Sequence, residues 1–142
     1  MIDRVTAERL LGRAREASAM AYAPYSGFPV GAVVLVPTGE VFEGANIENA
    51  SYPLTCCAER VAVFRAVMAG HREISAVAVF APKAKPCPPC GACRQVLNEW
   101  RPPAGDMDVV LEAPDGAEVV PLGDLLPRSF GPRDLDATGN GG

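Results

Sequence analysis

Three cysteines and one glutamate stand at spacings that suit metal chemistry. Cys90 and Cys93 are three residues apart, and positions i and i+3 of a helical turn face the same way, so both sulfurs can meet one ion. Cys57 stands upstream, and Glu59 follows it by two residues, about half a helical turn around. The pattern predicts one zinc ion held by Cys57, Cys90 and Cys93, with Glu59 beside the metal rather than on it.

The number of protein ligands decides what kind of zinc site this is. Three ligands leave one position of a tetrahedral ion for water, which is the catalytic pattern, whereas four ligands make a closed structural site. Zinc lowers the pKa of its bound water toward ~7, and Glu59 is placed to take up the proton. Burial would suit Glu59 to this role by raising its pKa. Arg60 is expected to offset the negative charge that three thiolates leave on one divalent ion.

Two further cysteines leave an alternative open. Cys87 precedes Cys90 by three residues, so this pair has the same spacing as Cys90 and Cys93, and Cys56 adjoins the upstream ligand. Prolines between Cys87 and Cys90 remove backbone donors that a thiolate at 87 would use, and Pro89 suits the start of a helix. A structural knuckle with Cys87 as fourth ligand is the competing interpretation. The only histidine, His71, is expected in a solvated turn.

Composition narrows the class of protein. The 142 residues fit one domain with a real core, and charged residues make up 21% of them. The net charge is −4 and no stripe of Lys or Arg is present, which argues against nucleic acid as a partner. The first twenty residues mix charges throughout and no apolar run reaches membrane-spanning length, so we expect a cytoplasmic protein without a membrane partner. A reducing compartment also disfavours disulfides among the five cysteines.

The elements that must position these residues follow from periodicity. Apolar residues recur at helical spacing over residues 7–21, and β-branched runs predict strands. The expected strands cover residues 30–36, 41–47, 74–81, 109–113 and 119–120, and two further helices cover residues 57–69 and 90–100. The helix from Cys57 is expected to be buried on nearly every side, because Arg65 is its only charge after residue 60. This order predicts a three-layer α/β domain over residues 1–132, followed by a mobile tail over residues 133–142.

The motifs together resemble a known family. Cys57-Ala58-Glu59-Arg60 with Pro89-Cys90-Gly91-Ala92-Cys93-Arg94-Gln95 is similar to the short form of the zinc-dependent cytidine/deoxycytidylate deaminase family, and segments 25–32 and 44–52 resemble further family blocks. The resemblance covers roughly residues 5–130. It implies an α/β/α sandwich around a mixed five-stranded sheet and one zinc ion per subunit. The implied reaction deaminates cytidine and deoxycytidine to uridine and deoxyuridine in pyrimidine salvage, with Glu59 carrying the protons.

The same resemblance assigns substrate contacts. Asn46 and Glu48 would hydrogen-bond the ribose hydroxyls, which suits an amide beside a carboxylate. Phe28 and Ala58 would contact the nucleoside within the pocket, where a flat aromatic face suits a pyrimidine ring. The resemblance further implies a homotetramer with shared active sites. The residues that would reach a neighbouring subunit's site are Ala50, Tyr52 and Phe130.

Three other functions compete with this interpretation. A deaminase of a cytosine-containing antibiotic such as blasticidin S would share the zinc motifs. Four residues in the family blocks favour an ordinary nucleoside instead: Phe28, Asn46, Glu48 and Asn49. In a zinc-stabilised interaction module, Glu59 would merely cap a helix. A deaminase of DNA or RNA would need a basic channel for phosphates, which the acidic balance argues against.

Overall fold

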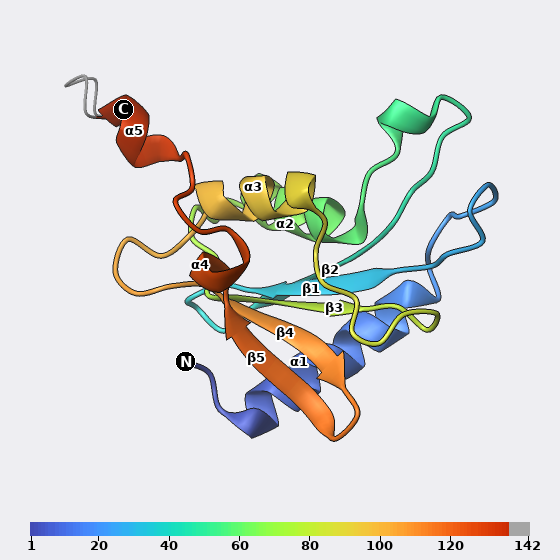
Figure 1. The fold of residues 1–142 in the computed structure, drawn as a ribbon, viewed down its shortest axis with the longest axis horizontal. Coiled ribbons are helices and arrows are strands. Elements are labelled where there is room, and N and C mark those ends of the chain that lie inside the picture. Colours follow the sequence, from blue (N-terminus) through green and yellow to red (C-terminus); the bar gives the residue numbers. More distant parts are fainter. Residues whose placement is uncertain (137–142) are drawn as a thin grey trace.

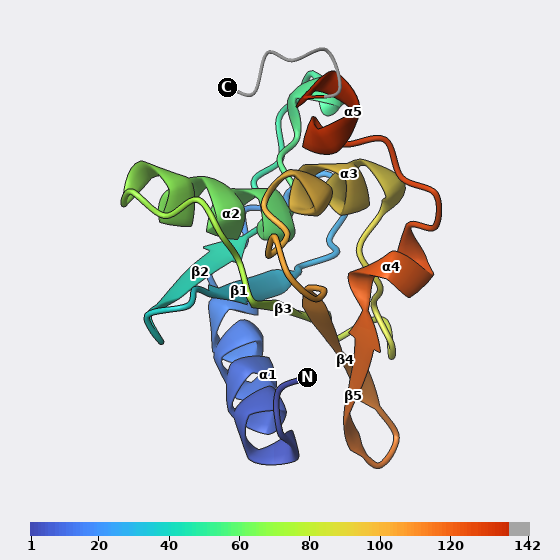
Figure 2. The ribbon, with the colours of Figure 1, turned by 90° about the vertical axis from the view of Figure 1, so that its left-hand side faces the viewer.

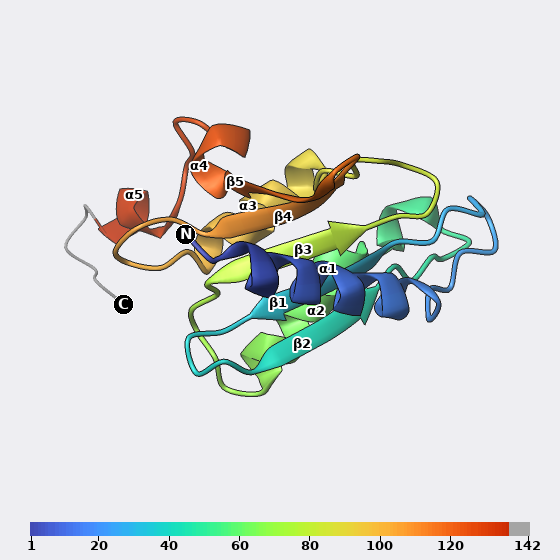
Figure 3. The ribbon, with the colours of Figure 1, turned by 90° about the horizontal axis from the view of Figure 1, so that it is seen from below.

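Five strands form one mixed sheet, and helices cover both of its faces (Figure 1). The computed structural model describes residues 1–136 of the chain. Helix α1 (Arg4–Ser18) packs against one face, and helices α2 (Ala58–Met68) and α3 (Gly91–Glu99) lie over the other (Figures 2 and 3). The predicted α/β/α sandwich is therefore confirmed.

The strands follow the order β2-β1-β3-β4-β5 across the sheet. They are β1 (Gly31–Leu35), β2 (Val41–Ala45), β3 (Ala76–Phe80), β4 (Asp108–Ala113) and β5 (Gly116–Pro121). Strand β1 pairs antiparallel with both β2 and β3, β3 pairs parallel with β4, and β4 pairs antiparallel with β5. A parallel pair needs a crossover connection, and α3 supplies it between β3 and β4. This connection places the start of α3, with Cys90 and Cys93, over the sheet.

The central strands β1 and β3 are buried along their whole length, which explains their uninterrupted apolar sequences. Successive side chains point to opposite faces of a strand, so each strand feeds two cores. Val34 and Val79 join the core beneath α2 and α3, whereas Val33 and Ala78 join the core beneath α1. The predicted strands are confirmed, with ends one or two residues shorter for the first three and a longer β5.

Gly44 allows β2 to lie directly against the first turns of α2. A Cβ atom at this position would stand 2.5 Å from the carbonyl oxygen of Ala58 and 2.5 Å from the backbone nitrogen of Ala62. Only glycine permits such a close approach of two backbones. The contact fixes the start of α2, where Cys57 and Glu59 stand, relative to the sheet.

The expectation that α2 is buried on nearly every side is wrong. Ala62, Val63 and Ala66 face the sheet, but Phe64 is 48% exposed and Met68 is 87% exposed. An apolar sequence indicates that side chains avoid water, but it does not show whether the same chain or another molecule buries them. The outer face of α2 accordingly carries apolar side chains, Phe64 and Met68, that residues 1–136 leave exposed.

Three short helical segments were not predicted. They are the 3₁₀ turn Tyr52–Leu54 and the helices α4 (Leu122–Leu125) and α5 (Pro132–Asp136). Part of the predicted mobile tail, residues 133–136, belongs to α5, and residues 137–142 lie outside the described residues. Among the helices of residues 1–136, none combines the length and apolarity needed to cross a bilayer.

Candidate metal centre and adjoining cavity

The ligand atoms of Cys57, Cys90 and Cys93 all lie within 4.8 Å of one another. In a tetrahedral zinc site with Zn–S bonds of about 2.3 Å, neighbouring sulfurs are roughly 3.8 Å apart, so one ion fits between these three with little adjustment. Within residues 1–136 no other His, Cys, Asp or Glu joins this group. The structure thus brings together the three cysteines selected from their spacing and gives no support to Cys87 as a fourth ligand.

Two helix N-termini converge at this point. Cys57 is the N-cap of α2, Cys90 is the N-cap of α3, and Cys93 lies buried in the first turn of α3. Neither N-cap side chain forms a capping hydrogen bond, so both sulfurs stay available. Free backbone N–H groups and the positive ends of two helix dipoles favour thiolate over thiol. The predicted helix start shifts by one residue, because Cys90 caps α3 and does not belong to it.

Charge and hydrogen bonding favour ionisation of Cys57. The Nη2 of Arg60 donates a hydrogen bond to Cys57 Sγ at 3.2 Å. Hydrogen bonding with Cys93 is the main cause that lowers the pKa of Cys57 to about 5, and the hydrogen bond from Arg60 lowers it further. The hydrogen bond between the two cysteines raises the pKa of Cys93. Without a cation the sulfurs therefore share protons, which a metal ion would displace. Thiolates in a tetrahedral arrangement are a donor set that zinc prefers.

Glu59 lies inside the protein, beside the sulfurs. It occupies the first turn of α2 and is only 4% exposed. Burial raises the pKa of its carboxyl group, because the charged form loses hydration. A carboxyl group whose pKa is raised toward neutrality can both accept and release a proton during one reaction cycle. This is the position and the environment that the sequence predicted for it.

A cavity of about 170 Å³ opens onto the metal-binding residues. Cys57, Cys90 and Glu59 all contribute to its wall. The other lining residues are Val30, Asn46, Thr55, Ala58, Cys87 and Pro88. Of these, Asn46 and Ala58 were predicted from sequence as substrate contacts. Val30 lies in segment 25–32, which resembles a family block, but no role was predicted for it. No signal in the sequence marked Thr55.

Asn46 shapes one side of this cavity. Its Nδ2 donates to the carbonyl oxygen of Phe28 at 2.9 Å, and its Oδ1 accepts from the backbone N–H of Val30 at 2.9 Å. The buried amide therefore holds residues 28–30 against the end of β2. An amide nitrogen has two N–H groups, so one of them is left for another acceptor.

Glu48 lies in a neighbouring groove and not in this cavity. Its carboxylate accepts hydrogen bonds from the backbone N–H groups of Tyr25 and Ser26, at 2.9 and 3.1 Å, and from the Ser26 hydroxyl. The Ser26 hydroxyl is the main cause of its lowered pKa. Thr55 lines both the cavity and the groove, so the two spaces adjoin at this residue.

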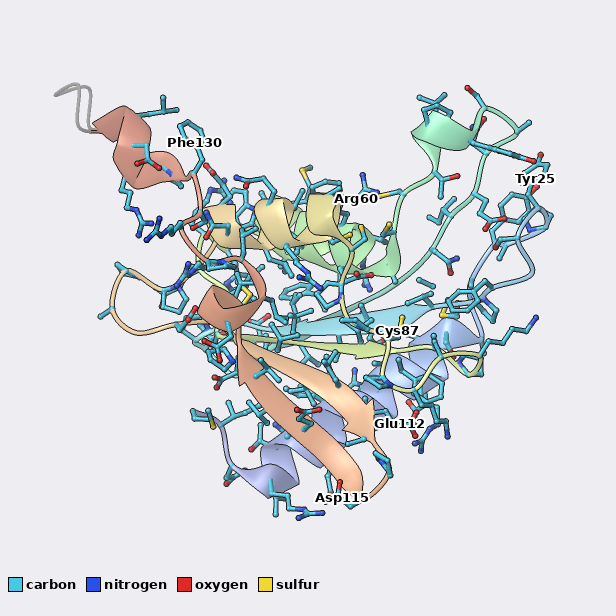
Figure 4. All side chains as sticks on the ribbon, in the orientation of Figure 1. Tyr25, Arg60, Cys87, Glu112, Asp115 and Phe130 are labelled. Atoms are coloured by element: carbon cyan, nitrogen blue, oxygen red, sulfur yellow. The ribbon has the colours of Figure 1, made fainter. Side chains whose placement is uncertain are left out.

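The remaining predicted substrate residues do not line the chain's own cavity. Phe28 contributes its carbonyl group to Asn46, and Ala50 is exposed. Tyr52 is 69% exposed, packs on Tyr25 with ring centroids 5.9 Å apart, and lines the groove that holds Glu48. Phe130 is 62% exposed and extends near the C-terminal end of α3, whereas Cys87 and Arg60 lie toward its N-terminal end (Figure 4).

Cys87 and His71 differ in part from their expected surroundings. Cys87 lines the cavity although it is not among the clustered sulfurs, and burial raises the pKa of its thiol. His71 follows α2 as predicted, but it is more enclosed than a solvated turn residue. Its ring packs at a tilt of 56° against Phe42, with ring centroids 5.4 Å apart, and its Nε2 lies 3.6 Å from Glu40 Oε1.

Comparison with known protein families identifies one match over most of the chain. The family described as "Cytidine and deoxycytidylate deaminase zinc-binding region" matches residues 4–107. A cytidine deaminase of Halalkalibacterium halodurans is 46% identical over 130 residues, which cover 91% of this chain and 97% of that protein. A cytidine deaminase of Mycobacterium tuberculosis is 44% identical over 128 residues, which cover 89% and 90%.

Solved structures give the same result for the fold. The crystal structure of cytidine deaminase from Burkholderia pseudomallei superposes with a TM-score of 0.79 at 46% sequence identity, covering 86% of this chain and 97% of that chain. The structure of cytidine deaminase from Mycobacterium tuberculosis superposes with a TM-score of 0.75 at 42% identity, covering 87% and 95%. Both proteins match this chain along nearly their whole length.

Proposed function

The chain belongs to the cytidine and deoxycytidylate deaminase family, and on that premise we propose that it hydrolyses cytidine to uridine and ammonia at a zinc centre. One observation carries the proposal. Three cysteine sulfurs cluster within 4.8 Å, and two of these cysteines share a cavity with the buried carboxyl group of Glu59. Cys57, Cys90 and Cys93 are the proposed ligands. The reaction returns cytosine nucleosides to the uridine pool, as in pyrimidine salvage.

Bound zinc supplies a nucleophile at neutral pH by lowering the pKa of water toward ~7. Glu59 moves the protons that the reaction requires. As the water oxygen bonds to C4, the Glu59 carboxylate would accept one proton from it and deliver that proton to N3 of the cytosine ring. It would then take the second proton from the same oxygen and pass it to the amino group, which leaves as ammonia when the C4–N bond breaks. A buried glutamate suits this exchange, because burial raises the pKa of its carboxyl group and makes the protonated form easier to reach than in an exposed glutamate.

The cavity and the adjoining groove together form the proposed nucleoside site. Asn46 and Ala58 stand in the same cavity as Glu59, and Asn46 keeps one N–H available for a ribose hydroxyl. Glu48 faces the next groove across Thr55, so a nucleoside that spans Thr55 would reach both polar side chains. Phe28 adjoins this region through its bond to Asn46. Deoxycytidine is the proposed second substrate.

A homotetramer with shared sites is part of the proposal. Ala50 and Phe130 are exposed and line neither the cavity nor the adjoining groove, which supports a role at a neighbouring subunit. Tyr52 is exposed as well and lines the groove, where its free face could meet another subunit. An apolar groove of about 400 Å³ runs over the outer face of α2 and supports burial against another copy. Its apolar lining comes from Ile47, Leu54, Cys56, Val61, Phe64 and Met68. Light scattering coupled to gel filtration should give the mass of four chains.

A cytoplasmic location is also proposed. All five cysteines are free thiols in the structure, and three of them stand in the metal-binding cluster. Thiolate ligands persist in a reducing compartment, whereas oxidation would pair them. Fractionation of cells producing the chain should place it with cytoplasmic markers.

The activity is tested with purified zinc-loaded protein and separate incubations of cytidine, deoxycytidine and blasticidin S. Chromatography should show uridine and deoxyuridine, each formed with an equal amount of ammonia, and little change in the antibiotic. Glu59→Gln is the matched control, since it keeps the shape of the side chain and removes the exchangeable proton. Intact cytidine after prolonged incubation with zinc-loaded protein would contradict the proposal and favour a zinc-stabilised interaction module.

A further inference from the structure

The side chain of Arg94 bridges two segments that are far apart in sequence. It follows Cys93 directly on α3, and its Nε donates to the carbonyl oxygen of Pro89 at 2.7 Å. Its Nη1 donates to the carbonyl oxygen of Leu125 at 2.8 Å. Within residues 1–136 no carboxylate forms an ion pair with Arg94, so both charge-assisted hydrogen bonds go to neutral carbonyl groups.

The contact with Pro89 acts on the metal-binding turn. Pro89 is buried and immediately precedes Cys90, the N-cap that supplies one of the three sulfurs. A hydrogen bond to its carbonyl oxygen fixes the peptide plane between Pro89 and Cys90, and thereby the direction in which Cys90 leaves the backbone. Groups that orient metal ligands in this way affect metal affinity strongly.

The contact with Leu125 acts on the segment that presents Phe130. Leu125 ends α4, and residues 125–131 then run beside α3 (Figure 1). The far end of this segment is held by two amides of α3, because Gln95 Nε2 and Asn98 Nδ2 both donate to the Phe130 carbonyl oxygen at 2.9 Å. The backbone is therefore fixed at both ends, while the Phe130 ring remains 62% exposed.

We propose that Arg94 is a positioning residue that couples the metal-binding turn of α3 to residues 125–131, so that the zinc ligands and Phe130 are held in one rigid frame. The kinetic part of this inference rests on the proposed function. Arginine suits the position because its planar guanidinium presents donors in two directions at once. The single ammonium of lysine cannot replace both contacts.

The test compares Arg94→Ala and Arg94→Lys with the matched control Gln95→Ala, which loosens the Phe130 carbonyl without touching Pro89. Two quantities are measured on zinc-loaded protein: the rate of zinc release into excess chelator, followed with a zinc-binding dye, and KM and kcat for cytidine. Arg94→Ala should release zinc roughly tenfold faster or more and should raise KM more than it lowers kcat. Gln95→Ala should raise KM alone.

Zinc release from Arg94→Ala at the wild-type rate would overturn the inference, and so would faster release without any change in KM. Thermal unfolding of each variant verifies that it is folded. If Arg94→Ala does not fold, Arg94→Lys decides, with zinc release expected above the wild-type rate and an unchanged rate overturning the coupling. Wild-type protein that binds zinc but leaves cytidine intact would contradict the proposed function instead, and the zinc-release comparison would still test the role of Arg94 at the metal-binding turn.

Discussion

The guanidinium of Arg60 donates a hydrogen bond to the sulfur of Cys57, with Nη2 and Sγ 3.2 Å apart. Both residues stand at the start of α2, and the contact raises the pKa of Arg60. Its Nε is buried without a hydrogen-bond partner in residues 1–136. Three thiolates would give a bound divalent ion a net charge of −1, which Arg60 is placed to offset.

Replacement of this arginine should weaken zinc binding in acid. Arg60 is one cause of the lowered pKa of Cys57, after the hydrogen bond with Cys93. In Arg60→Ala the pKa of Cys57 rises, protons compete with zinc at higher pH, and the pH of half-maximal zinc loss moves upward. Zinc content after dialysis at a series of pH values measures this. Arg72→Ala, which removes an exposed arginine beyond the end of α2, should follow the wild-type curve.

The metal centre could be predicted from sequence because its signals are local. Cys90 and Cys93 share one helical turn, and Glu59 follows Cys57 on another, so spacing alone aligns them. The arrangement of layers also followed from alternating strands and helices, whereas the strand order comes from the structure alone. Within the metal centre, only the proximity of the starts of α2 and α3 depends on tertiary structure.

Other features depended on contacts that spacing does not encode. Asn46 and Glu48 are two residues apart, yet they face different spaces, because Glu48 binds the backbone of Tyr25 and Ser26 more than twenty residues away. The exposed face of α2 was missed for a similar reason. Phe64 is apolar like a core residue, and only the structure shows that 48% of it stays exposed within residues 1–136.

The substitution Glu59→Gln should abolish turnover and keep the metal. Glutamine preserves the size of the side chain but cannot carry protons, so kcat should fall by roughly 10²- to 10⁴-fold. Zinc content should be unchanged, since Glu59 is not part of the ligand group. Steady-state kinetics and metal analysis of the same preparation test both statements. Wild-type turnover in this variant would remove Glu59 from the mechanism.

The thermal stability of the wild-type protein and of Glu59→Gln should depend differently on pH. Burial raises the pKa of Glu59 above its ordinary value of 4.5, so the buried carboxylate is the unfavourable form. The stability associated with the neutral form is present at low pH and is lost as pH rises through the folded-state pKa. Apoprotein with Glu59 should therefore lose thermal stability relative to Glu59→Gln as pH increases. Parallel melting curves across the pH series would contradict the raised pKa.

Replacement by serine should have different effects on zinc binding at Cys87 and at Cys93. Cys93 is buried in the sulfur cluster, so Cys93→Ser should lose zinc and activity together. Cys87 lines the cavity but stands outside the cluster, so Cys87→Ser should retain zinc and most of the activity. Metal content per chain distinguishes the two variants. Zinc loss in Cys87→Ser would instead support the four-cysteine structural site.

Gly44 should be intolerant of a methyl group. Gly44→Ala would place Cβ 2.5 Å from backbone atoms of α2, and relief requires the helix to move. Overpacking of this kind costs about 1–3 kcal/mol or more, and here it would also displace Cys57 and Glu59. Gly12→Ala is the matched control, because Gly12 lies within α1 with open space around it and should be stabilised by roughly 0.5–1 kcal/mol. Chemical denaturation of both variants measures the difference, and equal stabilities would contradict the close contact.

The most direct measurement is a zinc titration of metal-free protein with cytidine present. Uridine formation should be absent without metal, should rise in proportion to added zinc, and should reach its plateau at one zinc ion per chain, with no response in Cys93→Ser. Protein that takes up one zinc ion per chain and forms no uridine, or that forms uridine equally well without metal, would contradict the assignment of this three-cysteine centre as the site of deamination.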